Sequence, residues 1–363
     1  MEGLSCCPTK VDAQYEAISV MGRRRASVGA TSMLARISLA SMLLLSSCSD
    51  LRSADSPGMT KPRESQGQGR LGGCIPASAS LPLLGIPGDS PILPVQVRGQ
   101  KAAMFFSPGF VPLLFRNNGL ISFQKLRHVY LRQQDGDVLS ASASIASSLS
   151  VGDLKAADRT GYLLPDPDDR IANGRPIIGM LGRDILPGGA IVELDIPGRR
   201  ITFSIPQIGC PSSSHSPPTR SISMQQEVLL VPVQINGQLV QAVLDPDLPV
   251  SVLPSNMANT VGLSSADLAK DKSVVTKFGK SVLGRRHHVK TLDVGDVRLQ
   301  NFAFDVEDDV QYAMLGLNFF DLGQAVFDFS DQRFSFTQTT KVLPSATSLH
   351  FDQTKVAYVS INQ

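Results

Sequence analysis

The sequence predicts an all-β protein in which two similar lobes follow one another along the chain. Residues 93–100 read Leu-Pro-Val-Gln-Val-Arg-Gly-Gln, and residues 231–238, 138 positions later, read Val-Pro-Val-Gln-Ile-Asn-Gly-Gln. Both segments are typical of a strand that ends in a tight hairpin turn. Helical periodicity is scarce, and only residues 255–262 and 317–322 are expected to form short helices. A repeated strand pattern with few helices indicates a duplicated β-fold.

The repeat continues without a gap into a turn that carries a carboxylate. Residues 104–109 (Met-Phe-Phe-Ser-Pro-Gly) align with residues 242–247 (Ala-Val-Leu-Asp-Pro-Asp), so that Ser107 falls on Asp245. An Asp on a loop that flanking strands hold rigid is the arrangement that acid–base chemistry requires. Asp245 is therefore the first candidate catalytic residue.

Three later landmarks also recur in the same order. The first is a turn, at 150–154 and again at 293–297. The second is an apolar segment that contains a Gly, at 180–186 and 314–320. The third is a closing hairpin, at 191–203 and 325–336. We expect a first lobe at 90–206, a second lobe at 226–338, a Ser- and Pro-rich linker at 207–225 and a C-terminal extension at 339–363.

Composition fits a folded protein with room for two domains. The chain has 363 residues, of which 42% are hydrophobic and 18% are charged. The formal net charge of +2 gives no reason to expect a nucleic-acid partner.

The N-terminal region resembles a bacterial lipoprotein signal. Arg residues at 23–25 precede a short apolar run at 37–45, which is too short to span a bilayer. The run ends in Leu-Ser-Ser followed by Cys48, the residue that carries the lipid in such signals. We expect a signal region at 1–48, a flexible tether at 49–80, and a periplasm-facing lipoprotein of the bacterial outer membrane. An ordinary secretory signal cut nearby is the alternative.

Two further cysteines lie one before each repeat. In an exported chain Cys74 and Cys210 can form a disulfide, and two separate thiols are the alternative. The cysteine spacing fits no zinc site. The acidic run at 166–169 matches no calcium loop and predicts an exposed turn. No cofactor or metal is expected.

The recurring landmarks resemble the retropepsin-like aspartic protease family, in the bacterial lipoprotein form with two fused repeats. The segment Met-Leu-Gly-Arg-Asp-Ile-Leu at 180–186 is close to the retropepsin version of its element. The resemblance implies an all-β fold of two retropepsin-like (acid protease) β-barrel lobes in a pepsin-like bilobal arrangement. It also implies aspartic-type endopeptidase chemistry.

The sequence departs from that family where the chemistry is done. The family uses two Asp residues, one from each lobe, which share a proton because two adjacent like charges cannot both ionise cheaply. Here Ser107 occupies the first position, and Pro108 and Pro246 replace the hydroxyl residues that follow. Asp247 replaces a Gly, and only Gly109 is kept.

Asp245 is thus the one carboxylate left at a catalytic position. Ser107 occupies the degenerate position of its partner. Asp247 is a weaker candidate for a second carboxylate, because Pro246 favours a turn. Ser107 lacks the neighbouring base and oxyanion motif that a nucleophile needs. Dimerisation through Asp245 is disfavoured because the first lobe already fills the partner position, so a monomer is expected.

Three functions remain open from the sequence. The protein is an aspartic peptidase with at most weak activity, or a pseudo-peptidase that binds an extended peptide by strand addition without cutting it. A structural envelope lipoprotein is the third. Arg285, Arg286 and His287 lie in the expected second flap hairpin, where they either contact a ligand or form a solvated basic tip.

Overall fold

The computed structural model describes most of the chain after residue 76. The described residues are 77–110, 112–132, 138–152, 154–155, 158–205, 222–223, 229–276, 282–308, 310–340 and 349–351. The expectations for Cys48, Cys74, Cys210, the signal region and the first flap turn at 135–137 lie outside them. Within these ranges no helix has the length and apolar character needed to cross a membrane.

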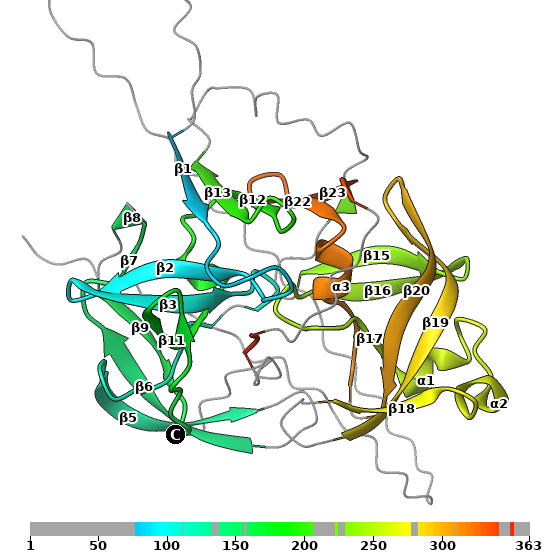
Figure 1. Ribbon diagram of the computed structural model, residues 1–363, viewed down its shortest axis with the longest axis horizontal. Coiled ribbons are helices and arrows are strands. Elements are labelled where there is room, and N and C mark those ends of the chain that lie inside the picture. The colour runs from blue at the N-terminus through cyan, green and yellow to red at the C-terminus, as the bar shows by residue number, and fades with distance from the viewer. Residues whose placement is uncertain are drawn as a thin grey trace, which may run out of the picture. The chain divides into compact units, whose positions relative to one another are not determined.

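The first lobe is built on a ten-stranded sheet (Figure 1), with β10 attached to β11 beside a main path in the order β5-β6-β9-β4-β11-β3-β2-β7-β8. Its strands are β2 Ile92–Val97, β3 Gln100–Phe106, β4 Leu114–Phe115, β5 Gln124–Arg132, β6 Val138–Ala146, β7 Ser150–Val151, β8 Leu154–Lys155, β9 Arg159–Leu163, β10 Ile171–Ala172 and β11 Arg175–Leu181.

The second lobe is built on a seven-stranded sheet in the order β15-β16-β21-β17-β20-β19-β18. An additional pairing of β15 with β19 closes part of this sheet on itself. Its strands are β15 Leu230–Ile235, β16 Gln238–Leu244, β17 Val252–Pro254, β18 Lys272–Thr276, β19 Val282–Val294, β20 Val297–Glu307 and β21 Ala313–Leu315.

A third, six-stranded sheet has the order β1-β13-β12-β22-β23-β14 and contains both closing hairpins. Strand β12 of the first lobe pairs antiparallel with β22 of the second, with Leu194 opposite Ala325. The two lobes therefore share one continuous sheet. Its strands are β1 Ala77–Pro82, β12 Ile191–Asp195, β13 Arg200–Ile205, β14 Ile222–Ser223, β22 Gly323–Asp328 and β23 Arg333–Gln338.

The first hairpin of each lobe has the same construction. Val97 pairs with Gln100 in one and Ile235 with Gln238 in the other, and β2 and β15 show the same order of buried and exposed positions. Both residues of each turn have positive φ, as a two-residue type I′ turn requires. The internal duplication itself stays a prediction, but these strands have matched geometry at the predicted offset.

Helices are few and short, as predicted. They are α1 Ser255–Ala258, α2 Ser265–Leu268, α3 Leu317–Phe320 and the 3₁₀ turn η1 Arg183–Ile185. Helices α1 and α3 begin where expected, whereas α2 was missed. Its start is stabilised by the Ser264 hydroxyl, which accepts a hydrogen bond from the Asp267 N–H at 3.1 Å. The all-β fold class predicted from the sequence is confirmed.

Candidate functional site

The loops that follow β3 and β16 meet at Ser107 and Asp245. The Ser107 Oγ donates a hydrogen bond to Asp245 Oδ1 at 2.8 Å, and both residues have 0% exposure. Each loop is anchored in the same way, since the Ser107 N–H donates to Leu181 O and the Asp245 N–H donates to Leu315 O. The structure thus brings together the two positions that the sequence placed in register.

The two proline residues fit because each loop is a tight turn. The Leu248 N–H donates to Asp245 O at 3.1 Å, and the Phe110 N–H donates to Ser107 O at 3.4 Å. Pro246 and Pro108 therefore stand at the second position of a turn, where a fixed φ near −65° is favourable. The turn expected at Pro246 is present.

Gly109 lies where the two loops come closest. A Cβ atom built on Gly109 would overlap with the main-chain oxygen of Leu244, the last residue of β16 in the second lobe. No side chain fits there without moving the backbone, so the close approach of the two lobes requires a glycine at this position.

We expect Gly109→Ala to lower the free energy of unfolding by about 2–4 kcal/mol, because the new methyl group forces the loops apart. Urea unfolding followed by far-ultraviolet circular dichroism measures this change. Gly119→Ala is the matched control, since a Cβ at Gly119 meets nothing within 4 Å. Equal effects of the two substitutions would show that the loops are not tightly apposed.

The two oxygens of Asp245 have different surroundings. Oδ1 accepts hydrogen bonds from the Ser107 hydroxyl and, at 3.2 Å, from the Asp247 N–H. Oδ2 is buried and has no hydrogen-bond partner among the described residues. Burial raises the pKa of Asp245 to about 7, against the opposing effect of the Ser107 hydrogen bond. Near neutral pH a large fraction of this carboxyl is therefore protonated.

Asp247 is also fully buried, but its carboxylate is already engaged. It accepts the Phe351 N–H at 3.1 and 3.2 Å, and its main-chain oxygen accepts the Ser90 hydroxyl at 2.9 Å. Burial, followed by the neighbouring charge of Asp245, raises the pKa of Asp247 well above its usual value. The two carboxyl groups interact electrostatically, yet Asp247 binds the main chain of residue 351 instead of completing a pair.

A polar brace behind each loop was not predicted. In the first lobe the Leu113 N–H donates to Asp184 Oδ2 at 3.0 Å, and in the second the Ser251 N–H donates to Asn318 Oδ1 at 2.8 Å. Asp184 and Asn318 hold the same place in the aligned segments 180–186 and 314–320. The alignment of these two segments was the sequence signal from which the pair Asp184 and Asn318 could have been found. Burial raises the pKa of Asp184 to about 6.

The basic residues expected at the second flap tip lie instead within strand β19. Arg286 forms a bidentate ion pair with Asp305 at 2.8 and 2.9 Å, and His287 Nδ1 lies 2.7 Å from Asp271 Oδ2. The prediction of a solvated hairpin tip was wrong for these residues, because β19 starts at Val282 and contains them. The side chains of Arg286 and His287 are satisfied by residues of their own lobe.

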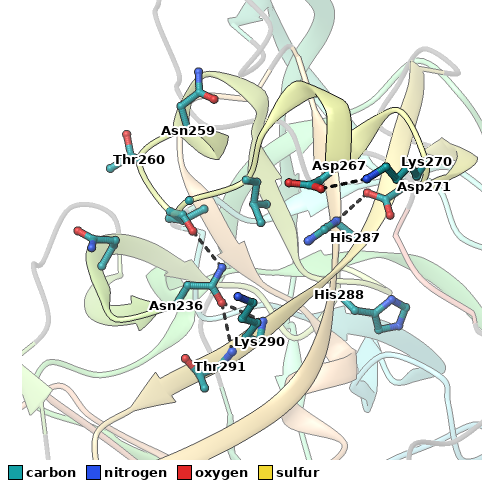
Figure 2. Close-up of a pocket in the computed structure, with 14 residues that line it drawn as sticks. Asn236, Asn259, Thr260, Asp267, Lys270, Asp271, His287, His288, Lys290 and Thr291 are labelled. Atoms are coloured by element: carbon teal, nitrogen blue, oxygen red, sulfur yellow. Dashed lines mark hydrogen bonds and ion pairs between the residues drawn. The ribbon is translucent and has the colours of Figure 1, made fainter.

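A surface pocket of about 990 Å³ adjoins this strand (Figure 2). Figure 2 shows His287 beside Asp271, with Asn236 and Lys290 on the neighbouring wall. The pocket contains neither Ser107 nor Asp245. It is therefore separate from the meeting point of the loops.

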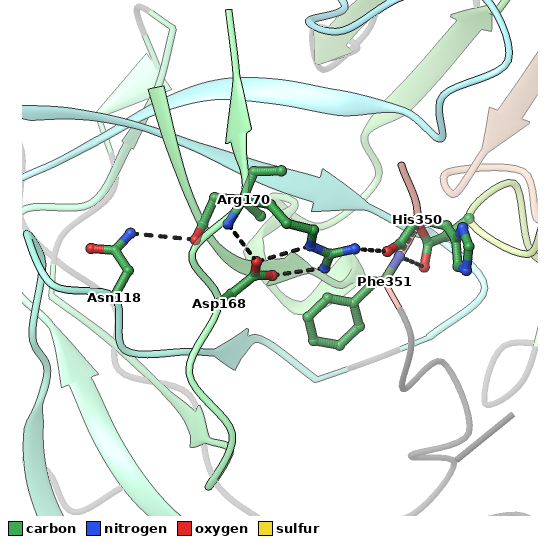
Figure 3. A network of polar contacts seen from close by, with 7 residues as sticks. Asn118, Asp168, Arg170, His350 and Phe351 are labelled. Carbon is green, nitrogen blue, oxygen red and sulfur yellow. Dashed lines mark hydrogen bonds and ion pairs between the residues drawn. The ribbon is translucent and has the colours of Figure 1, made fainter. Parts of the chain in front are cut away.

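The acidic run at 166–169, which the sequence predicted to be an exposed turn, is only partly exposed. Asp166 and Asp169 are exposed, but Asp168 is buried, so the expectation was wrong at this residue. Its carboxylate binds the Arg170 guanidinium at 2.7 and 2.9 Å (Figure 3), which compensates for burial. In the described part of the chain no three His, Cys, Asp or Glu side chains are grouped as metal ligands.

Two β-lobes are joined by a shared sheet, and their turns meet at Ser107 and Asp245. A family model described as aspartyl protease matches residues 231–319, the part of the second lobe that contains Asp245. This match supports an aspartic protease-like family for the chain.

Comparison with solved structures gave, among others, an aspartic proteinase from Irpex lacteus. The two have a TM-score of 0.46 and 10% sequence identity, over 72% of this chain and 98% of that one. Comparison with curated proteins gave no match.

Proposed function

We propose that this protein is an envelope lipoprotein of the aspartic peptidase type that binds an extended peptide and has at most weak endopeptidase activity. One observation carries the proposal. The position that should provide the second carboxylate provides the Ser107 hydroxyl, 2.8 Å from Asp245 Oδ1.

The expected chemistry follows from the protons that Asp245 and Ser107 can donate or accept. Aspartic proteolysis needs one carboxylate to take a proton from water and one carboxylic acid to protonate the peptide carbonyl. Asp245, with its pKa near 7, can supply a proton or accept one, but it has no acidic partner across the loops. The Ser107 hydroxyl is a donor that cannot share the proton at physiological pH. The arrangement therefore lacks the second acid that the activation of water requires.

Asp247 does not replace the missing acid in this arrangement. Its two oxygens accept the main-chain N–H of Phe351, and it lies on the same turn as Asp245 instead of on the opposite loop. A catalytic pair in this family spans the two lobes. The position of Asp247 therefore supports binding over cleavage.

The location at the envelope rests on residues 1–48. We propose that Cys48 carries the lipid and that the folded part faces the periplasm. Metabolic labelling with an alkyne fatty acid is expected to mark the wild type, and Cys48→Ala is expected to lose the label. A labelled Cys48→Ala protein would contradict this assignment.

The function is tested by two assays on the purified full-length protein. A diverse peptide mixture is analysed by mass spectrometry for captured peptides and for cleavage products, from pH 3.5 to 7.5, beside Asp245→Ala. We expect the wild type to capture peptides and to cleave them at a rate close to that of Asp245→Ala. Strong cleavage that the variant loses would mean that one carboxylate suffices. Folded protein that captures no peptide would favour a structural role.

A further inference from the structure

Residues Leu349, His350 and Phe351 lie against the loop that carries Asp247, although Phe351 and Asp247 are 104 positions apart in the sequence. Phe351 is 1% exposed, and Leu349 packs beside the same core cluster. The segment is therefore packed into the fold, and specific contacts hold it there.

Main-chain atoms of the segment make most of its polar contacts. The Leu349 N–H donates to Asp89 Oδ1 at 2.7 Å, and Leu349 O accepts the Ser90 N–H at 2.9 Å. The N–H and the carbonyl of one residue are thus both bound by neighbours in sequence. This pattern is the way in which proteins bind extended peptides, because it recognises the backbone regardless of side chains.

The next two residues continue the pattern on other partners. His350 O accepts a hydrogen bond from Arg170 Nη1 at 2.6 Å, and the Phe351 N–H donates to both oxygens of Asp247. Figure 3 shows Arg170 held between Asp168 and the His350 carbonyl. The buried carboxylate of Asp168 fixes the guanidinium in this position.

One side chain, Phe351, enters an apolar environment with a defined shape. Its ring lies 5.9 Å from the Phe105 ring at an interplanar angle of 56°, and the Arg116 guanidinium lies 4.8 Å above it. Arg170 in turn lies 5.3 Å above the Phe105 ring. An aromatic ring flanked by a second ring and a guanidinium is favoured here over an aliphatic or charged side chain.

We propose that this surface is a peptide-binding subsite that selects an aromatic side chain, and that residues 349–351 occupy it as an internal ligand. The subsite is defined by Asp89, Arg170 and Asp247, which bind the main chain, and by Phe105 and Arg116, which flank the ring. Its natural ligand is an extended peptide with an aromatic residue whose N–H reaches Asp247. The inference rests on the proposed peptide-binding function and adds its specificity and its regulation.

Tethering explains how such a segment competes with free peptides. A ligand on the same chain acts at an effective concentration in the range of about 1 mM. A free peptide of equal intrinsic affinity must exceed that concentration to displace it. Release of residues 349–351 therefore exposes the subsite to other peptides.

The absence of Trp from the sequence allows a direct test of occupancy. Phe351→Trp introduces a single Trp, whose emission we expect to be blue-shifted and shielded from acrylamide in the full-length protein. A synthetic peptide with the sequence of residues 345–355 should shift this emission to the red only at millimolar concentration. An emission spectrum and a quenching constant like those of free tryptophan would overturn the inference.

Competition is tested by binding the same peptide, labelled with fluorescein, to full-length wild type and to Phe351→Ala. We expect at least tenfold tighter binding by Phe351→Ala, and tenfold weaker binding of a peptide in which the Phe is replaced by Ala. Phe336→Ala is the matched control, because Phe336 is similarly buried in another part of the core. It is expected to bind like the wild type.

The outcomes separate this inference from the proposed function. Equal affinity of wild type and Phe351→Ala overturns the internal ligand but leaves peptide binding intact. No binding of any peptide by either protein, while the Phe351→Trp variant still shows blue-shifted emission, overturns the proposed function and the selective subsite with it. Indifference to the Phe in the peptide overturns the aromatic selectivity.

Discussion

Replacement of Ser107 by Asp is expected to raise peptide cleavage at mildly acidic pH by about 100-fold or more over the wild type. The new carboxyl group would lie within hydrogen-bond reach of Asp245, because the Ser107 Oγ already lies 2.8 Å from Asp245 Oδ1. Two carboxyl groups at that separation share one proton, so that one serves as acid and the other as base. General acid–base catalysis of this kind contributes about 10²- to 10⁴-fold to a rate.

The measurement is the cleavage rate of a fluorogenic peptide mixture between pH 3.5 and 7.5. It is made in the wild-type background and with Phe351→Ala, so that residues 349–351 do not block the site. Ser107→Asn is the control of similar size without an acid, and Asp245→Asn combined with Ser107→Asp should remove the gain. A folded Ser107→Asp protein that is no faster than Ser107→Asn would locate the defect in the proline turns instead of in the missing carboxylate.

The second large effect concerns stability as a function of pH. Asp245 has a folded-state pKa of about 7, raised from 3.8 chiefly by burial. Because the folded state holds the proton more tightly than the unfolded state, ionisation destabilises the fold. The cost is absent below about pH 4, grows as the pH rises towards 7, and is fully present above that value. A shift of this size corresponds to an upper limit on the order of 4 kcal/mol.

Asp245→Asn is therefore expected to stabilise the protein at pH 8 relative to the wild type and to have little effect at pH 4.5. The amide oxygen can still accept the Ser107 hydroxyl and the Asp247 N–H, whereas no charge is buried. Urea unfolding at both pH values measures the difference, with Asp331→Asn on an exposed turn as the control. Equal loss of stability with rising pH in wild type and Asp245→Asn would contradict the assignment of the burial cost to Asp245.

The sequence predicted those parts of the site that depend on local pattern and on constant spacing. Strand–turn–strand segments are readable from alternation and turn residues, and their constant offset alone placed Ser107 opposite Asp245. The same alignment contained the brace residues Asp184 and Asn318 without indicating which main-chain N–H each would bind. That partner lies 71 residues away in one lobe and 67 in the other.

The contacts of residues 349–351 could not be predicted from local pattern or constant spacing. Leu349 binds Asp89 across 260 positions of sequence, and no periodic pattern reports a contact of that length. The burial of Asp168 was missed because acidic and Pro-rich segments usually remain in water. Its neighbour Arg170 supplies the charge that makes burial possible, and that pairing is visible only in three dimensions.

The pairing of β12 with β22 has a consequence for how the site can change over time. When two identical subunits build a symmetric site, every substitution appears on both sides at once. Here a continuous sheet joins two halves that are encoded by separate stretches of one gene. A codon change at position 107 therefore leaves position 245 untouched, so one half can lose its acid while the other keeps it. A single chain with two joined lobes can therefore have an asymmetric site with one Asp, whereas two identical subunits always contribute the same residue to both halves.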